Sequence, residues 1–457
     1  DSNVIVLMID SLRYDHLGFN GNTWIKTPNL DKFAQDCIIF DNAYPEGLPT
    51  IPVRTSLFTG NRTLPFRPWQ PLEPEDITIA EILASHGYLC ALIADTYHLA
   101  KPGMNLHKGF HIFRWIRGQE ADAYESTPHN FDLSKYMKDA MKGDWVEKML
   151  DQYFRNRAWW QKEEDYFTPR VMNEAISWLK NNTGKHEKFF LWIDNFDPHE
   201  PWDPPDPFDK MYTNPDYKGP KLIHPKYGPV NWMTEEELQY VRGLYAGEVA
   251  FVDKWVGKLF ATIDELGLLD NTLIIVLADH GHPHGDHGTI MKTPENLYSE
   301  LLKIPLLVRL PGASLKDKRV FPIVGTQDIP VSILEFLGMG IETECMDGRS
   351  VWPLVEGKKE KIRDYIVSGF YQSYHRVVRN EDWSYIRRPQ GLKDELYSLK
   401  EDPKEKNNLI DQYPEVTERM RKAIGRLFWG PPQVPFPNVQ LEYEVSGTPI
   451  DYGMTNW

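Results

Sequence analysis

The sequence is poor in cysteine, has no excess of basic residues and contains no apolar run of membrane-spanning length. Its three cysteines, Cys37, Cys90 and Cys345, are far apart and lack metal-binding spacing, so we expect small core residues and no need for an oxidising compartment. The formal net charge of −15 argues against nucleic acid and acidic membranes, because both require basic patches. We therefore expect neither partner. No targeting segment lies in the printed chain, which leaves a cytoplasmic and a periplasmic location both open.

Four short, continuous apolar runs stand out in a chain of otherwise globular composition. Continuous rather than alternating hydrophobicity is typical of strands that are buried on both faces of a parallel sheet. Amphipathic helical patterns alternate with these runs, which are Val4–Ile9, Leu89–Ala94, Phe189–Ile193 and Leu273–Ala278. The pattern predicts an α/β fold with a large, mostly parallel sheet sandwiched by helices.

The sequence changes character twice along its length. Residues 110–170 are rich in tryptophan and charge and predict a helical insertion within a catalytic domain of residues 1–367. From residue 368 to 457, short alternating strands, one helix and a Pro-rich tail predict a smaller α+β subdomain, and the tail is a candidate oligomer contact. Two interpretations of Trp145, Trp159 and Trp160 stay open: they wall a substrate site and favour a ring-bearing or sugar group, or they pack the added helices.

Acidic and imidazole side chains follow each of the four predicted strands. Because the carboxyl ends of parallel strands meet at one edge of a sheet, these residues predict an active site there. They are Asp10 after the first strand, Asp95, Thr96 and His98 after the second, Asp197 and His199 after the third, and Asp279 and His280 after the fourth.

The segment "ADHGHPHGDHGTIMK", residues 278–292, carries the densest chemistry. Asp279 and His280 offer a carboxylate and an imidazole, and together with Asp10 and an oxygen of Thr50 they predict a site for one divalent metal ion. An imidazole with few carboxylates favours Mn²⁺ or Zn²⁺ over Ca²⁺. Lys292 supplies a cation from the same segment.

Two further cationic or donor groups, Arg54 and His199, would join Lys292 in holding the outer oxygens of a tetrahedral anion. A metal, a hydroxyl and such donors describe a site for sulfuryl or phosphoryl transfer. The hydroxyl lies in "GLPTIPVRTSLFTG", residues 47–60. Taken alone, this stretch is better explained as an ordinary helix start, with Thr50 as its cap and Pro52 in the first turn.

These motifs together resemble the sulfatase family of the alkaline phosphatase superfamily over nearly the whole chain. "TIPVRTSLFTG" is similar to the family's nucleophile motif, "DPHEPW" to its His-bearing loop and "DHG…GDHGTIMK" to its metal and lysine motif. "QDIPVSILEFLG", "DGRSVWPL" and "ELYSLKEDPKEKNNL" resemble its downstream signatures. The resemblance implies an alkaline-phosphatase-like fold and a metal site that in family precedent often holds Ca²⁺.

The resemblance also implies roles for individual residues. Asp10, Asp279 and His280 would be metal ligands, and Arg54 would orient a nucleophile at position 50. His98 would assist the nucleophile, and His199 and Lys292 would grip the oxyanion or the leaving group. Thr96 and His287 are the predicted substrate-binding residues.

Three departures from the family pattern bear on activity. The usual pair of aspartates is Asp10-Ser11, and a substrate-binding lysine is replaced by Thr96. The nucleophile position holds Thr50, a secondary alcohol that cannot yield the family's formylglycine and gives only a ketone on oxidation. The same departures resemble the phosphonate monoester hydrolase and phosphodiesterase branch.

Three readings follow from these departures. The first is a sulfate ester hydrolase acting through position 50, with a small-molecule or saccharide ester as its substrate. The second is a phosphate, phosphodiester or phosphonate ester hydrolase that uses Thr50 directly as the nucleophile. Within these two, Thr50 could also be an engineered replacement that traps substrate. The third is a binding protein without catalysis on the same scaffold.

Overall fold

The computed structural model describes residues 2–186 and 188–428. Within these residues the main body is an eight-stranded sheet of order β12-β2-β11-β9-β1-β7-β5-β6. Its strands are β12 (Lys318–Val320), β2 (Ile38–Phe40), β11 (Leu306–Arg309), β9 (Thr272–Leu277), β1 (Asn3–Ile9), β7 (Phe189–Asn195), β5 (Leu89–Ala94) and β6 (Ile112–Trp115). The four predicted strands therefore form four neighbouring strands, β9-β1-β7-β5, at the centre of this sheet.

The central strands run parallel, and β1 lies between β7 and β9. Ile9 pairs with Asn195 of β7, and Met8 pairs with Leu277 of β9. This register brings the residues after β1, β7 and β9 to the same edge of the sheet. Among the described strands of this sheet, β11 runs against its neighbours β2 and β9, so the sheet is mixed but mostly parallel, as predicted.

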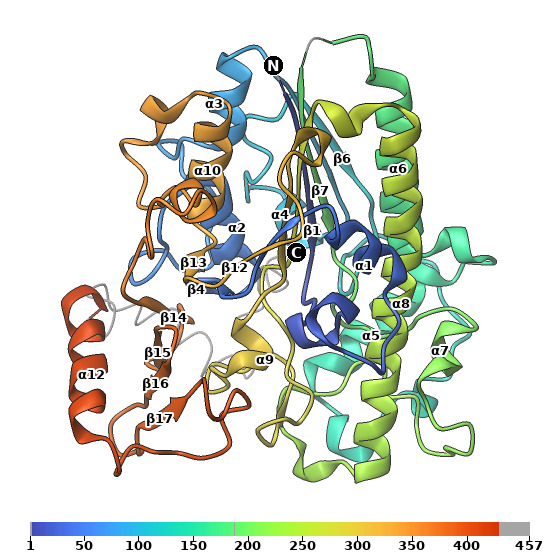
Figure 1. Cartoon of the computed structure of the whole chain (residues 1–457). Coiled ribbons are helices and arrows are strands. Elements are labelled where there is room, and N and C mark those ends of the chain that lie inside the picture. The colour runs from blue at the N-terminus through green and yellow to red at the C-terminus, as the bar shows by residue number, and fades with distance from the viewer. Residues whose placement is uncertain (1, 187, 429–457) are drawn as a thin grey trace.

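Helices cover both faces of the sheet (Figure 1). On one face lie α2 (Thr50–Thr59), α3 (Ile79–Ser85) and α10 (Asp328–Phe336), and on the other lie α1 (Pro28–Ala34), α6 (Phe167–Asn182) and α8 (Glu235–Glu265). A capping box between Thr234 and Glu237 begins α8, because each side chain accepts a hydrogen bond from the other residue's backbone N–H. No helix among residues 2–186 and 188–428 is both long and apolar enough to cross a membrane.

Short elements complete the main body. The two-stranded pairs are β3 (Ala43–Tyr44) with β13 (Val324–Gly325) and β8 (Gly228–Pro229) with β10 (Thr289–Ile290). The short helices are α4 (Tyr97–Ala100), α7 (Phe208–Met211), α9 (Ser299–Leu302) and α11 (Trp352–Val355). The expectation that all cysteines are core residues is wrong for Cys345, which is exposed, whereas Cys37 and Cys90 are buried.

The predicted insertion at residues 110–170 is only partly helical. It begins with β6, which pairs in parallel with β5 at the edge of the main sheet, and then contains α5 (Trp145–Arg157). Residues 112–115 were expected to be helical with the rest of the insertion, and that expectation is wrong. Backbone pairing with the edge strand β5 satisfies the hydrogen bonds of this segment in place of a helix.

The C-terminal part forms a second sheet of order β17-β16-β15-β14-β4, with α12 (Pro414–Phe428) beside it (Figure 1). Its strands are β17 (Glu395–Ser398), β16 (Trp383–Arg387), β15 (Arg376–Arg379), β14 (Ile366–Phe370) and β4 (Gly47–Leu48). The predicted strands and helix are confirmed, but β4 comes from the segment just before Thr50. The expected boundary at 367/368 lies inside β14, and the division into two domains stays a prediction. The Pro-rich tail, 429–457, and its oligomer contact lie outside the described residues.

Candidate active site

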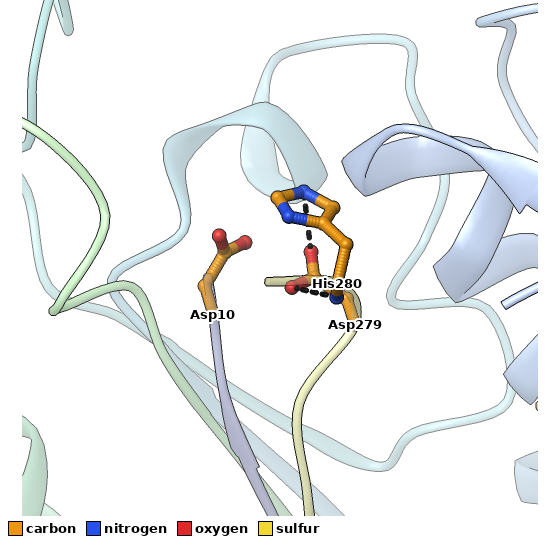
Figure 2. A group of neighbouring side chains, drawn as sticks. All are labelled: Asp10, Asp279 and His280. Carbon is orange, nitrogen blue, oxygen red and sulfur yellow. Dashed lines mark hydrogen bonds and ion pairs between the residues drawn. The ribbon is translucent and has the colours of Figure 1, made fainter. Parts of the chain in front are cut away.

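Two neighbouring strands place three ligand-type side chains together. Asp10 follows β1, and Asp279 and His280 follow β9; Figure 2 shows the three side chains grouped at the strand ends. One ligand atom from each lies within 4.8 Å of the others, and all three residues are buried. The Nδ1 atom of His280 lies 2.8 Å from the carbonyl oxygen of Gly281, to which it donates. This bond leaves Nε2 with its lone pair free, and Nε2 has no hydrogen-bond partner among the described residues.

The backbone around these ligands is held in a fixed shape. The N–H groups of Ser11 and His280 both donate to Asp279 Oδ1, at 3.0 and 2.8 Å. Gly281 donates its N–H to the carbonyl of Leu301 at 2.6 Å, and a Cβ at Gly281 would lie 2.1 Å from the carbonyl oxygen of Glu300. Only glycine allows this approach, so the turn after β9 is fixed by its sequence.

Arg54, on the second turn of α2, is enclosed by three carboxylates. Its Nη2 lies 3.0 Å from Asp10 and 2.7 Å from Asp194, and its Nη1 lies 2.7 Å from Asp279. Burial opposes the charge, but the carboxylates of Asp194, Asp279 and Asp10 raise the pKa of Arg54 well above its usual value. With all three carboxyl groups ionised, one guanidinium leaves a surplus of two negative charges in a group with no solvent exposure.

The surplus negative charge shows that the group fits a divalent cation. Burial, and then repulsion by Asp279, raise the pKa of Asp10 well above the usual value. A cation placed between Asp10, Asp279 and the unpartnered Nε2 of His280 would balance both surplus charges and give that nitrogen its missing partner. The donor set of two carboxylates and one imidazole is typical of divalent metals.

Thr50 is the first residue of α2, which ends at Gly60 with a left-handed φ of 71°. Pro49 occupies the cap position, so the interpretation of Thr50 as a helix cap is wrong. The Thr50 side chain makes no hydrogen bond to any of the described residues, whereas its carbonyl oxygen accepts one from Arg54 Nη1 at 3.2 Å. The hydroxyl is thus held at a helix N-terminus next to Arg54 without being used by the fold.

Asp194 is a site residue that the sequence analysis missed. It lies inside β7, where the predicted strand ended one residue earlier at Ile193. Besides binding Arg54, Asp194 Oδ1 accepts a hydrogen bond from Thr96 Oγ1 at 2.6 Å, and its Oδ2 accepts one from Trp192 Nε1 at 3.1 Å. The only indication of Asp194 in the sequence is that a carboxylate occurs in an otherwise apolar strand.

His199 and Lys292 lie together, as the predicted site requires. Lys292 Nζ donates to His199 Nε2 at 2.9 Å, and His199 Nδ1 in turn donates to the Glu200 carbonyl at 2.7 Å. Burial lowers the pKa of His199 well below its usual value, so the imidazole is neutral and accepts from the ammonium.

Glu200 is a second residue of the candidate site that the sequence analysis missed. It links the His199–Lys292 pair to neighbouring side chains. Its carboxylate lies 2.7 and 2.8 Å from Lys292 Nζ, 2.8 Å from His282 Nε2 and 2.5 Å from the hydroxyl of Tyr227. Although burial opposes it, the Lys292 ammonium holds the pKa of Glu200 well below its usual value. Glu200 therefore stays charged and keeps the Lys292 ammonium in place.

His98 and His287, two further predicted site residues, differ in their surroundings. Burial lowers the pKa of His98, on α4, well below its usual value, and its Nε2 lies 3.4 Å from Glu120 Oε2. His287 is not brought to the metal-type group: its Nδ1 lies 2.6 Å from Glu300 Oε1 and its Nε2 lies 2.9 Å from the Glu405 carbonyl. Its assignment to substrate binding stays a prediction that no contact in the described residues supports.

Comparison with known proteins decides the family. A profile described as Sulfatase matches residues 2–339, and one described as N-sulphoglucosamine sulphohydrolase, C-terminal, matches residues 285–428. The chain belongs to the sulfatase family. This family member is an enzyme that hydrolyses ester bonds.

Two curated relatives cover almost the full length of this sulfatase-family chain. An arylsulfatase of Clostridium perfringens (strain 13 / Type A) is 29% identical over 461 residues, covering 92% of this chain and 93% of that protein. A multifunctional alkaline phosphatase superfamily protein, PehA of Trinickia caryophylli, is 26% identical over 480 residues, covering 89% and 91%.

Solved structures confirm the alkaline-phosphatase-like fold. A phosphonate monoester hydrolase of Agrobacterium radiobacter superposes with a TM-score of 0.73 at 21% identity, covering 93% of this chain and 95% of that one. A protein solved with its substrate D-glucosamine-2-N,6-O-disulfate superposes with a TM-score of 0.72 at 19% identity, covering 98% and 99%.

Proposed function

We propose that this sulfatase-family enzyme hydrolyses sulfate esters in a metal-dependent reaction, with Thr50 as the nucleophile. The observation that carries the proposal is the placement of an unused hydroxyl at the start of α2, one helical turn before Arg54, which itself binds Asp10 and Asp279. Family membership supports the hydrolysis of an ester, and the arrangement of these side chains supports the role proposed for each residue.

Asp10, Thr50, Asp279 and His280 would hold one divalent ion. When bound, it supplies positive charge that lowers the pKa of a coordinated hydroxyl and neutralises negative charge developing on the substrate oxygens. The imidazole of His280 favours Mn²⁺ or Zn²⁺, whereas the family resemblance favours Ca²⁺.

The side chains of this chain then perform a two-step displacement. Thr50 Oγ1 gives its proton to the neutral imidazole of His98 and attacks sulfur, while the bond from sulfur to the leaving oxygen breaks. The leaving alcohol takes a proton from the His199–Lys292 pair. Water then attacks the sulfur of the Thr50 ester and gives a proton to the His199–Lys292 pair. The bond from sulfur to the Thr50 oxygen breaks, sulfate departs, and His98 returns its proton to the Thr50 oxygen. Arg54 holds the Thr50 carbonyl and so fixes the direction of attack.

A second candidate is hydrolysis of a phosphodiester or phosphonate monoester by the same residues. The side chain of Thr50 favours it, because an unmodified alcohol suits a covalent phosphoryl intermediate and cannot become formylglycine. The relative described as multifunctional and the fold similarity to a phosphonate monoester hydrolase are consistent with this chemistry.

The test compares wild type, Thr50→Ala and Thr50→Ser on four 4-nitrophenyl esters: sulfate, phosphate, bis-phosphate and phenylphosphonate, with metal supplied. We expect Thr50→Ala to lower kcat on the preferred ester by about 10³-fold or more, and Thr50→Ser to retain most of it. Thr262→Ala, which removes a buried threonine hydroxyl from α8, is the matched control. The preferred ester decides between sulfate and phosphorus chemistry.

Mass spectrometry of the Thr50 peptide, quenched during turnover, gives a second readout. A sulfuryl or phosphoryl adduct on Thr50 supports the nucleophile assignment. Equal activity of Thr50→Ala and wild type refutes it. No turnover of any of the four esters by wild type refutes the proposed function and leaves a binding protein.

A further inference from the structure

A second group of buried polar side chains lies beside the proposed catalytic residues, and of its members only the proposed base His98 has a role in the mechanism above. This Glu120 group consists of Glu120, His98 and His224. Glu120 Oε2 lies 3.4 Å from His98 Nε2, and Glu120 Oε1 lies 4.0 Å from His224 Nε2. Each of the three residues is more than nine-tenths buried.

Each member of the Glu120 group keeps a polar atom that the fold does not use. Glu120 Oε2, His98 Nδ1 and His224 Nε2 have no hydrogen-bond partner within the described part of the chain. Buried polar atoms without partners destabilise a fold, and a bound ligand is one means of supplying the missing hydrogen bonds. Glu120 also has a left-handed backbone, with φ at 46°, a strained conformation that is typical of functional sites.

The hydrogen-bonding character of these atoms defines the ligand. His224 Nδ1 lies 3.0 Å from the carbonyl oxygen of Pro225 and donates to it, which makes Nε2 an acceptor. Burial raises the pKa of Glu120 to about 7, so above this pH its carboxylate is an acceptor as well, and it already accepts a hydrogen bond from the hydroxyl of Tyr97. Two neighbouring acceptors without donors call for a ligand with at least two adjacent hydroxyl or amine donors.

Solvent exposure differs within the site. Asp10, Arg54, Asp279, His280 and His224 have no solvent exposure, whereas Glu120, His98 and Lys292 keep 4, 6 and 8%. Through Trp145, His224 is linked to side chains around the Lys292 ammonium. Trp145 packs edge-on against His224, with ring centroids 5.4 Å apart, and lies 6.0 Å from Tyr227, whose hydroxyl binds Glu200. On the other side, Trp69 packs edge-on against His98 at 5.0 Å.

We propose that Glu120 and His224 form a leaving-group subsite that recognises adjacent hydroxyl or amine groups of a saccharide ester, between the aromatic walls of Trp69 and Trp145. The proposal rests on the proposed ester hydrolysis and names the class of alcohol that the enzyme releases. One sugar donor binds Glu120 and its neighbour binds His224 Nε2, while the apolar faces of the sugar ring contact the indoles. An aryl leaving group offers no donor to either acceptor.

The experiment compares an ester with sugar donors and an ester without them. We would measure kcat/KM of wild type, Glu120→Gln and His224→Phe on 4-nitrophenyl sulfate and on D-glucosamine 6-sulfate, with the corresponding phosphates in parallel. We expect each variant to lower kcat/KM for the sugar ester at least tenfold further than for the aryl ester. Glu248→Gln is the matched control, because Glu248 is equally buried, has an unpartnered Oε2 and lies on α8. Its ratio should equal that of wild type.

A binding readout keeps the proposal separate from the chemistry. Free D-glucosamine should inhibit aryl ester hydrolysis by wild type, and Glu120→Gln and His224→Phe should raise its inhibition constant at least tenfold. Equal losses on both esters with an unchanged inhibition constant would overturn the subsite. So would bound zinc in wild type that either substitution releases, because the group would then be a metal site. Absence of all aryl ester turnover refutes the proposed function instead, which is a different result.

Discussion

Replacing Glu200 should reveal how the ammonium group of Lys292, a proposed catalytic residue, is held in place. In Glu200→Gln the shape is retained, but the Lys292 ammonium loses a carboxylate that contacts it through both oxygens, at 2.7 and 2.8 Å. The Glu200 side chain has no exposure and that of Lys292 has 5%, so water cannot replace the lost charge. Removing one partner of such a buried pair costs about 3–5 kcal/mol of folding stability.

Activity should fall as well, because Lys292 and His199 depend on Glu200 for their position. The amide of glutamine presents an N–H₂ group to either Lys292 or His282, both of which need an acceptor in the described geometry. A displacement of the cation by about 1 Å corresponds to roughly a 10²-fold loss in kcat/KM. We expect this loss on the preferred 4-nitrophenyl ester, together with a lower midpoint of urea unfolding.

Glu405→Gln is the control that separates positioning from stability. Glu405 is also a buried carboxylate, paired with Arg379 at 2.6 Å and bound by Ser299, but it lies in the C-terminal part. It should lose comparable stability with kcat/KM within threefold of wild type. If Glu200→Gln unfolds earlier but hydrolyses the ester at the wild-type rate, the positioning role is refuted. An equal rate loss in both variants would refute it too.

Three further predictions follow from other parts of the molecule. Chelation should remove one divalent ion per chain and abolish turnover. His280→Ala should show less than one bound ion by elemental analysis. At a metal concentration 100 times its Kd, the bound ion should add about 2.7 kcal/mol to the free energy of unfolding. Burial raises the pKa of Glu46 to about 7 from 4.5, so its stabilising effect is complete below pH 4.5 and is lost as pH rises through 7. Urea unfolding should therefore show Glu46→Gln gaining up to about 3 kcal/mol relative to wild type between pH 5 and 8, and a constant difference contradicts this. Trp160→Ala should lower the melting temperature and reduce the free energy of unfolding by an amount near the lower end of about 3–5 kcal/mol, without changing the preferred ester. Trp145→Ala should change that preference.

The tryptophan prediction reflects how the two sequence interpretations divide in the structure. Trp160 packs against Tyr166 and Phe167, with ring centroids 4.5 and 4.9 Å away, and so contributes to helix packing. Trp159 is 44% exposed, whereas Trp145 contacts His224 beside the proposed site. The sequence could not separate these roles, because all three residues lie in one aromatic, charged segment without a distinguishing pattern.

The strands and the residues directly after them could be predicted because both depend on local sequence. Continuous apolar runs identified the four central strands, and parallel order then placed Asp10, Asp279 and His280 at one edge. Asp194 and Glu200 could not be assigned in this way. Their roles come from long-range contacts, with Arg54 140 residues away and with Lys292 92 residues away, which no spacing rule encodes.

Two of the three departures from the family pattern, Ser11 and Thr96, compensate one another electrostatically. Ser11 stands where the resemblance places a second aspartate, and it removes one negative charge. Thr96 stands where the resemblance places a lysine, and it removes one positive charge. The net charge of the site is therefore unchanged by the pair.

The hydroxyls of Ser11 and Thr96 both donate a hydrogen bond to a carboxylate. Ser11 Oγ donates to Asp10 at 2.8 Å, and Thr96 Oγ1 donates to Asp194 at 2.6 Å. Each substitution thus keeps a hydrogen bond to a carboxylate that binds Arg54, while it gives up a full charge. A metal bound by fewer carboxylates would retain more of its positive charge, and that charge would replace the missing lysine in attracting the ester anion. The departures are therefore coherent with an active enzyme, and they favour chemistry in which Thr50 attacks without prior oxidation.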